Sequence, residues 1–88
     1  MNYQNIYNNL IINAKSEYRI KYNGTYYEKH HILPKCLGGD NSFNNLVLLT
    51  AKEHYIAHKL LILIYPKNKG LIFAFWRLSS DCSLKRVS

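Results

Sequence analysis

The first part of the chain alternates hydrophobic and polar residues at the spacing of an α-helix. Apolar side chains recur every three or four positions, and the positions between them are rich in asparagine. The pattern predicts one helix over roughly residues 3–16. Because asparagine is a poor helix former, packing of the apolar face must hold this helix in place. That face consists of Tyr3, Ile6, Tyr7, Leu10, Ile11 and Ala14.

The next segment has the pattern of a β-hairpin. An alternation of apolar and basic residues leads into Asn23-Gly24, a pair that favours a type I′ turn, and β-prone residues resume after it. The sequence therefore predicts a hairpin over residues 18–27. Extended chain is expected to continue over residues 28–33 and to end in a glycine-rich loop.

The second half of the chain predicts a strand followed by two helices. Residues 46–49 form a short apolar run that is typical of a buried strand. Thr50 and Glu53 have the spacing of a capping box, so a helix is expected to begin there and to reach about Tyr65. A further apolar segment, residues 71–78, predicts a last helix.

The length of the chain bounds its organisation. Eighty-eight residues form one small domain rather than two, because each half of the chain would be too short to bury a hydrophobic core of its own. We therefore expect a single α+β domain over residues 1–88, with the polar, basic segment 79–88 as a flexible tail. The apolar runs are too short to cross a bilayer, which predicts no membrane partner.

Charge and cysteine content narrow the partners and the compartment. Twelve Lys and Arg residues against five Asp and Glu residues give a net charge of +7, which favours nucleic acid as the partner. Only two cysteines occur, with no C-x-x-C pair, which indicates a reducing compartment. A cytoplasmic protein with two free thiols is expected.

All four histidines occur in two pairs. His54 and His58 are four positions apart on a predicted helix, so both imidazoles project from one face and suit a single metal ion. His30 and His31 are adjacent in extended chain. Taken alone, a pair such as His54 and His58 is more often made of ordinary surface or packing histidines, and His30-His31 alone is a weaker signal still.

The two pairs belong to a longer ordered pattern. It reads Glu28-x-His30-His31, then Gly38-Gly39, then Asn45 before the apolar run, then His54-x-x-x-His58. In this order and spacing the sequence resembles the HNH endonuclease family, closest to its phage and homing-type members, with the two-plus-two histidine arrangement of the colicin nucleases. The resemblance covers residue 28 to about residue 61. It implies a ββα-metal finger over about residues 28–65, flanked by N- and C-terminal helices.

The same resemblance implies a metal-dependent DNA endonuclease that hydrolyses phosphodiester bonds. His30, His54 and His58 would bind one divalent cation. His31 would be the general base, Asn45 would orient it through a hydrogen bond, and Glu28 would support the metal-binding histidines. Adjacent residues on a regular strand face opposite sides, so a regular strand through both His30 and His31 would count against these roles.

The metal and the partners follow from this set of expectations. Three neutral imidazoles suit Zn²⁺, Ni²⁺ or Co²⁺, whereas Mg²⁺ or Mn²⁺ would serve activity once phosphate oxygens complete the coordination shell. Double-stranded DNA is the expected partner, and one site per chain predicts nicking of one strand. The chain would act as a monomer or homodimer, or with a larger DNA-recognition partner. The lysines expected to neutralise backbone phosphates are Lys29, Lys35, Lys52 and Lys59.

Two alternatives remain open from the residues alone. The histidines could hold a structural zinc in a DNA-binding module that does not cut, with Cys36 or Asp40 as the nearest fourth ligand. The nuclease could also act on RNA, which the basic charge allows equally well.

Overall fold

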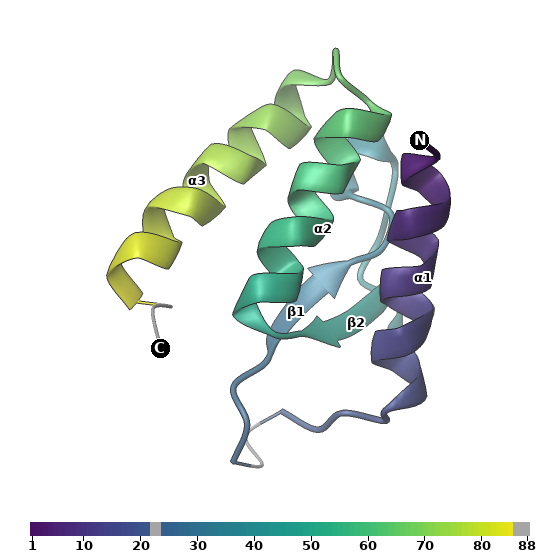
Figure 1. Ribbon diagram of the computed structural model, residues 1–88, viewed down its shortest axis with the longest axis vertical. Helices are drawn as coiled ribbons and strands as arrows, with labels where there is room; N and C mark the ends of the chain where they lie inside the picture. Colours follow the sequence, from purple (N-terminus) through teal and green to yellow (C-terminus); the bar gives the residue numbers. More distant parts are fainter. Residues whose placement is uncertain (22–23, 86–88) are drawn as a thin grey trace.

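The computed structural model describes residues 1–21 and 24–85, with side chains as far as Leu78. Helix α1 (Tyr3–Ser16) is followed by strands β1 (Glu28–His31) and β2 (Leu46–Leu49), then by helices α2 (Ala51–Ile64) and α3 (Lys69–Lys85). Two short 3₁₀ turns, Lys35–Leu37 and Phe43–Asn45, lie between the strands. In Figure 1, α2 lies in front of the sheet, with α1 on one side of it and α3 on the other. The molecule is a small α+β domain built around a ββα unit.

Helix α1 has the bounds that its hydrophobic spacing predicts. Asn2 caps it, because its side-chain oxygen accepts a hydrogen bond of 3.1 Å from the backbone amide of Asn5. Tyr7, Ile11 and Ala14 are its buried residues. They lie at helical spacing, so packing of one face holds a helix whose other face is rich in asparagine.

The two strands pair antiparallel and present two different faces. Glu28 lies opposite Leu49 in the register, and His31 lies opposite Leu46. Alternation along each strand gives a buried face, here called the inner face, and a face that α2 does not cover, here called the outer face. The inner face carries Glu28, His30, Val47 and Leu49, and the outer face carries Lys29, His31, Leu46 and Leu48.

Helix α2 is the centre of the packing and begins where the capping box predicts. The Thr50 hydroxyl accepts from the Glu53 amide at 3.1 Å, and Glu53 Oε1 accepts from the Thr50 amide at 2.9 Å. The helix packs against both α1 and α3. Leu49 from the sheet, Leu61 from α2 and Leu71 from α3 are almost completely buried in this core.

The predicted hairpin over residues 18–27 is wrong in the part that the structure describes. Residues 18–21 and 24–27 contain turns, bends and irregular chain but no strand, and Tyr22 and Asn23 lie outside the described residues. The side chain of Arg19 explains this, because its Nη1 donates to the Leu48 carbonyl at 3.0 Å and its Nη2 donates to Glu53 Oε2 at 3.1 Å. The segment is thus tied to the domain by a side chain rather than by a backbone ladder.

The last helix is longer than its hydrophobic pattern predicts. Helix α3 continues beyond Leu78 as far as Lys85, into the segment expected to be a flexible tail, and residues 86–88 lie outside the described part. Asn68 fixes its beginning, because its side-chain oxygen accepts from the Leu71 amide at 3.0 Å. None of the helices in the described residues combines the length and the apolar character that a membrane span requires.

Candidate metal centre

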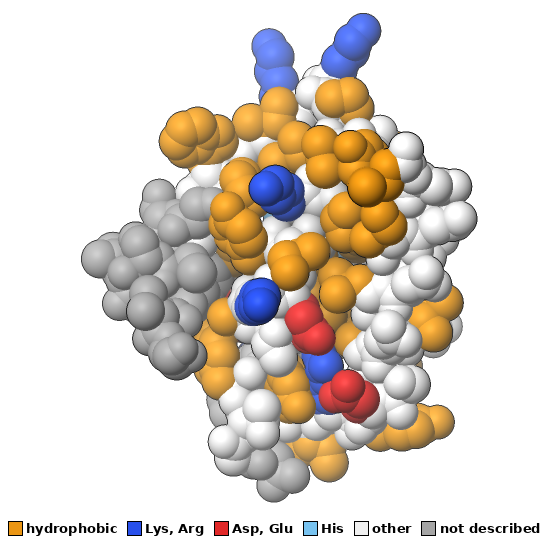
Figure 2. Space-filling model, viewed as in Figure 1, with side chains coloured by type: hydrophobic (Ala, Val, Ile, Leu, Met, Phe, Trp, Pro, Cys, Tyr) orange, Lys and Arg blue, Asp and Glu red, His pale blue; other side chains and the backbone are white. Residues whose placement is uncertain are grey.

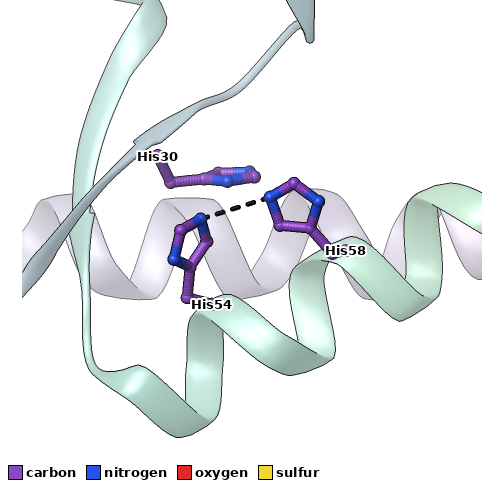
Figure 3. Close-up of side chains that lie close together, drawn as sticks. All are labelled: His30, His54 and His58. Atoms are coloured by element: carbon purple, nitrogen blue, oxygen red, sulfur yellow. Dashed lines mark hydrogen bonds between the residues drawn. The ribbon is translucent and has the colours of Figure 1, made fainter. Parts of the chain in front are cut away.

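Three histidines from two elements meet beneath the sheet. His30 comes from the inner face of β1, while His54 and His58 come from successive turns of α2. Figure 3 shows the three rings pointing toward one another. One ring nitrogen from each residue lies within 4.8 Å of the other two. The i,i+4 spacing on the helix and the strand pairing together build this cluster.

The Tyr7 hydroxyl from α1 holds His30. Its proton is donated to the Ile32 carbonyl at 2.7 Å, so its lone pair accepts from His30 Nε2 at 2.8 Å. His30 is only 2% exposed, and this burial, with the neighbouring histidines, lowers its pKa to about 2. Burial also raises the pKa of Tyr7, which keeps its hydroxyl neutral. The neutral His30 ring therefore presents its Nδ1 lone pair to the cluster, and this buried atom has no hydrogen-bond partner among the described residues.

The buried carboxylate of Glu28 holds His54 through the other ring nitrogen, Nδ1. Glu28 Oε1 accepts from His54 Nδ1 at 2.7 Å, and Glu28 Oε2 accepts from the Tyr26 hydroxyl at 2.5 Å. The proton on Nδ1 leaves the lone pair of His54 on Nε2, which lies 3.2 Å from His58 Nε2. The carboxylate of Glu28 therefore lies against His54, and the supporting role expected of Glu28 stays a prediction.

The donor set fits a divalent metal ion. Two nitrogens bound to one tetrahedral ion at about 2.0–2.1 Å lie about 3.3 Å apart, close to the 3.2 Å between His54 and His58. The orphaned Nδ1 of His30 supplies a third donor. Proteins usually orient a metal-binding histidine through a hydrogen bond from its second ring nitrogen to a neighbouring acceptor. Here the Tyr7 hydroxyl and the Glu28 carboxylate are these acceptors.

His31 lies at the edge of this cluster rather than in it. The strand runs through both His30 and His31 and ends at His31, so the two side chains leave the sheet on opposite faces. This is the arrangement expected to weigh against the catalytic roles. The end of the strand offsets it, because both residues still line the same cleft.

The side chain that holds His31 is Asn41, not Asn45. His31 Nε2 lies 2.7 Å from Asn41 Oδ1, so the predicted hydrogen bond from Asn45 is wrong. Asn45 instead ties the loop together: its Oδ1 accepts from the Leu33 amide at 2.8 Å, and its Nδ2 donates to the carbonyls of Leu33 and Asp40. Both Nδ2 protons are used on backbone oxygens, which leaves none for His31.

The tight loop explains the glycine beside it. A β-carbon at Gly39 would lie 1.7 Å from the Leu33 carbonyl oxygen, so no other residue fits without moving the backbone. Asn45 and Gly39 therefore act on the same short stretch of chain that follows His31. Asn41 was visible in the sequence only as one of several asparagines in this loop, and nothing in the sequence marked it as the partner of His31.

The three clustered histidines line a basic cleft of about 500 Å³. All four histidines line it, together with Lys29, Lys35 and Arg77, and no carboxylate is among its described lining residues. Sequence reasoning missed Arg77, which lies on α3 in one stripe with Leu71 and Ala74. That stripe at three-residue spacing was the available signal. Close packing of Gly70 against Cys36, where a β-carbon would lie 3.1 Å from Cys36 Cβ, brings α3 to the cleft.

The other two predicted DNA-contacting lysines lie outside this cleft. Lys52 and Lys59 are exposed residues of α2 and are not among the residues that line it. Figure 2, in the same view as Figure 1, shows Lys and Arg side chains scattered among hydrophobic ones, acidic side chains beside the lower ones, and no histidine on that face. The histidine cleft therefore opens in another direction.

Neither proposed fourth protein ligand belongs to the histidine group. Within the described part of the chain, the potential metal-binding group consists of His30, His54 and His58 alone. Cys36 is an exposed free thiol near Asn68, and the Asp40 carboxylate accepts from the Ser42 hydroxyl at 2.7 Å. A three-ligand site leaves positions for water or substrate, unlike the closed four-ligand sites of structural zinc.

The fold and the site define a small α+β domain whose ββα unit carries a group of three histidines that could hold a metal ion. Residues 16–54 match the family described as HNH endonuclease. The chain belongs to the HNH endonuclease family, as its pattern of histidines and asparagine predicts.

Several relatives of the chain come from Enterobacteria phage T4. The chain is 52% identical to probable mobile endonuclease D over 77 residues, which cover 86% of this chain and 30% of the relative. It is 48% identical to probable mobile endonuclease E over 85 residues, covering 97% of this chain and 55% of the relative. It is 41% identical to probable mobile endonuclease C over 88 residues, covering all of this chain and 41% of the relative. The chain thus spans between 30% and 55% of the length of these relatives. No solved structure matches it.

Proposed function

We propose that this chain is a metal-dependent endonuclease that hydrolyses phosphodiester bonds in double-stranded DNA. The observation that carries the proposal is the convergence of His30, His54 and His58, with an orphaned Nδ1 on the buried ring. Family membership and the printed names of the phage relatives support nuclease chemistry. The cleft supports a phosphate ligand, because Lys29, Lys35 and Arg77 line it and no described lining residue is acidic.

His31 is the proposed general base. Asn41 Oδ1 accepts from its Nε2, so the proton resides there and Nδ1 is the nitrogen that can take a proton from the attacking water. The water oxygen forms a bond to phosphorus while the bond from phosphorus to the 3′ oxygen breaks. The products carry a 5′-phosphate and, after protonation from solvent, a 3′-hydroxyl.

The other residues hold the substrate and the metal. His30, His54 and His58 would bind the ion, Glu28 and Tyr7 keep two of these rings in the ligating tautomer, and Asn45 and Gly39 keep the loop after His31 in place. When bound, a divalent ion supplies electrostatic stabilisation of the charge that develops on the phosphate and the leaving oxygen. Zn²⁺, Ni²⁺ and Co²⁺ suit three imidazoles, and Mg²⁺ or Mn²⁺ suits a shell completed by phosphate oxygens.

A single site per chain favours nicking of one strand by a monomer. The phage relatives support a role in the cytoplasm of an infected host cell. Target recognition would come from a larger partner or from regions like those that make the relatives longer.

Cleavage of supercoiled plasmid tests the proposal. The native chain and His31→Ala are incubated with Mg²⁺, Mn²⁺, Ni²⁺ or Zn²⁺, with Lys59→Ala as a control on the face of α2 away from the cleft. We expect the native chain and Lys59→Ala to form open circles, and His31→Ala to be slower by about 10²- to 10⁴-fold. Metal and DNA binding without cleavage by the native chain would contradict the proposal and favour a non-catalytic zinc module. Cleavage of competing RNA in preference to plasmid would contradict DNA as the substrate.

A further inference from the structure

The outer face of the sheet bears a second hollow, here called the outer-face groove. Its volume is about 900 Å³, and Leu46 and Leu48 of β2 and Ile12 of α1 give it an apolar lining. Two aromatic side chains at its margin are nearly fully exposed: Phe43 at 92% and Tyr18 at 87%. Large exposed apolar surfaces of this kind are typical of binding sites rather than of ordinary solvent-facing surface.

The charge around the outer-face groove is basic. Lys15, Arg19 and Lys29 line it, and no carboxylate is among its described lining residues. Arg19 is paired with both Glu17 and Glu53, a trio with one net negative charge, so the positive charge of the groove comes from Lys15 and Lys29. An apolar surface with aromatic and cationic margins complements a ligand that has both flat apolar rings and negative charges.

The groove lies next to the histidine cleft. Lys29 lines both hollows, and His31 lies opposite Leu46, whose side chain belongs to the groove. A nucleic-acid strand with one phosphate beside His31 would therefore extend from the histidine cleft into the outer-face groove.

We propose that the outer-face groove binds unpaired bases of the substrate strand next to the phosphate that is cut. Phe43 and Tyr18 stack on the bases, and Lys15 and Lys29 neutralise the phosphates between them. Bases in an intact duplex are already stacked and paired, so the groove takes a frayed, flipped or single-stranded segment. This inference deepens the proposed function and depends on it for the identity of the ligand.

Binding of a single-stranded oligonucleotide that contains 2-aminopurine tests the inference. The metal-loaded native chain is compared with Phe43→Ala, with Phe43→Tyr as the conservative variant. Phe73→Ala is the matched control, because Phe73 is 66% exposed on α3 and lines neither hollow. We expect Phe43→Ala to weaken binding about tenfold and to lose the stacking change in fluorescence, while the other two variants bind like the native chain. Circular dichroism checks that each variant folds, and a denaturing gel of the same samples scores cleavage.

The outcomes separate the inference from the proposed function. Equal affinity of Phe43→Ala and Phe73→Ala overturns the inference, even where the gel shows cleavage. Phe43-dependent binding with an uncut oligonucleotide supports the groove as a base-binding site even if the nuclease proposal fails. If Phe43→Ala changes the sedimentation of the free protein instead of its affinity for DNA, the groove is an interface between copies and the inference is overturned. An equal loss on the paired duplex overturns the restriction to unpaired bases.

Discussion

The inner and outer faces of one two-stranded sheet differ in almost every physical respect. On the inner face, Glu28 and His30 are buried and hydrogen-bonded to side chains from other parts of the fold. On the outer face, Lys29 is exposed and His31 and Leu46 are half-buried. Four consecutive residues of β1 therefore supply both environments, simply because side chains alternate across a strand.

For the proposed function, the contrast would place metal binding and substrate binding on different sides of the sheet. The inner face needs burial, because enclosed, hydrogen-bonded rings are held in one tautomer. The proposed function requires the outer face to stay open, because a phosphodiester strand would have to reach His31 and the basic side chains. Helix α2 covers one face only, and this one-sided packing allows both requirements to be met.

The largest effect is expected from removing the proposed metal ligand His58, which α2 presents to the inner face of the sheet. His58→Ala should lower the affinity for Zn²⁺ by more than about 100-fold, since even partners behind the ligands contribute about 10- to 100-fold. It should also remove most of the roughly 2.7 kcal/mol that a ligand adds to stability at a hundredfold excess over Kd. Calorimetric titration and thermal unfolding measure the two effects. His31→Ala is the outer-face control, and an equal loss of metal affinity in that variant would contradict the separation of the faces.

A smaller effect is expected when only the hydroxyl behind His30 is removed. Tyr7→Phe leaves the Ile32 carbonyl and His30 Nε2 without this partner, which should cost roughly 2 kcal/mol and lower Tm by about 10 °C. Metal affinity should also fall, because the tautomer of His30 is no longer selected. Tyr55→Phe keeps its ring contact with Phe75 at 5.1 Å and should change Tm little. If Tyr7→Phe unfolds at the same temperature as the native chain, the Tyr7 hydroxyl does not stabilise the position of His30 on the inner face.

The smallest effect concerns the boundary between the faces, where Arg19 of the groove meets Glu53 of α2. The hydrogen bond from Arg19 holds the pKa of Glu53 below its usual value of 4.5, so the ionised form stabilises the fold. This stability is present above pH 4.5 and is lost as pH falls through the lowered pKa of the folded protein. Glu53→Gln should therefore be about 1 kcal/mol less stable than the native chain at neutral pH and equal to it in strong acid.

Denaturant unfolding over a range of pH tests this last expectation. Glu17→Gln removes the other, more exposed carboxylate on Arg19 and should have a smaller effect. A difference between native and Glu53→Gln proteins that persists unchanged into strong acid would show that ionisation of Glu53 is not the cause.

Much of the candidate site could be predicted because its signals are local. The spacing of His54 and His58 requires only that the helix exists, and the capping box at Thr50 and Glu53 secures its beginning. Family resemblance added His30 to the proposed metal ligands, and in the structure its ring lies beside those of His54 and His58. The stripe that contains Arg77 indicated only a helix face, and the outer-face groove had no local signal, because the position of each depends on how distant elements pack.

The sequence alone determined the bounds of α1, the strand at residues 46–49, the start of α2 and the helical pair of histidines, since periodicity and capping act over a few neighbouring residues. Tertiary structure decided three further points. It converted the expected hairpin into a segment held by Arg19, made Asn41 the partner of His31, and turned Asn45 toward backbone carbonyls. The physical reason is the same in each case: a polar side chain takes whichever partner the packed fold brings within hydrogen-bond distance, and that choice depends on residues far away in the chain.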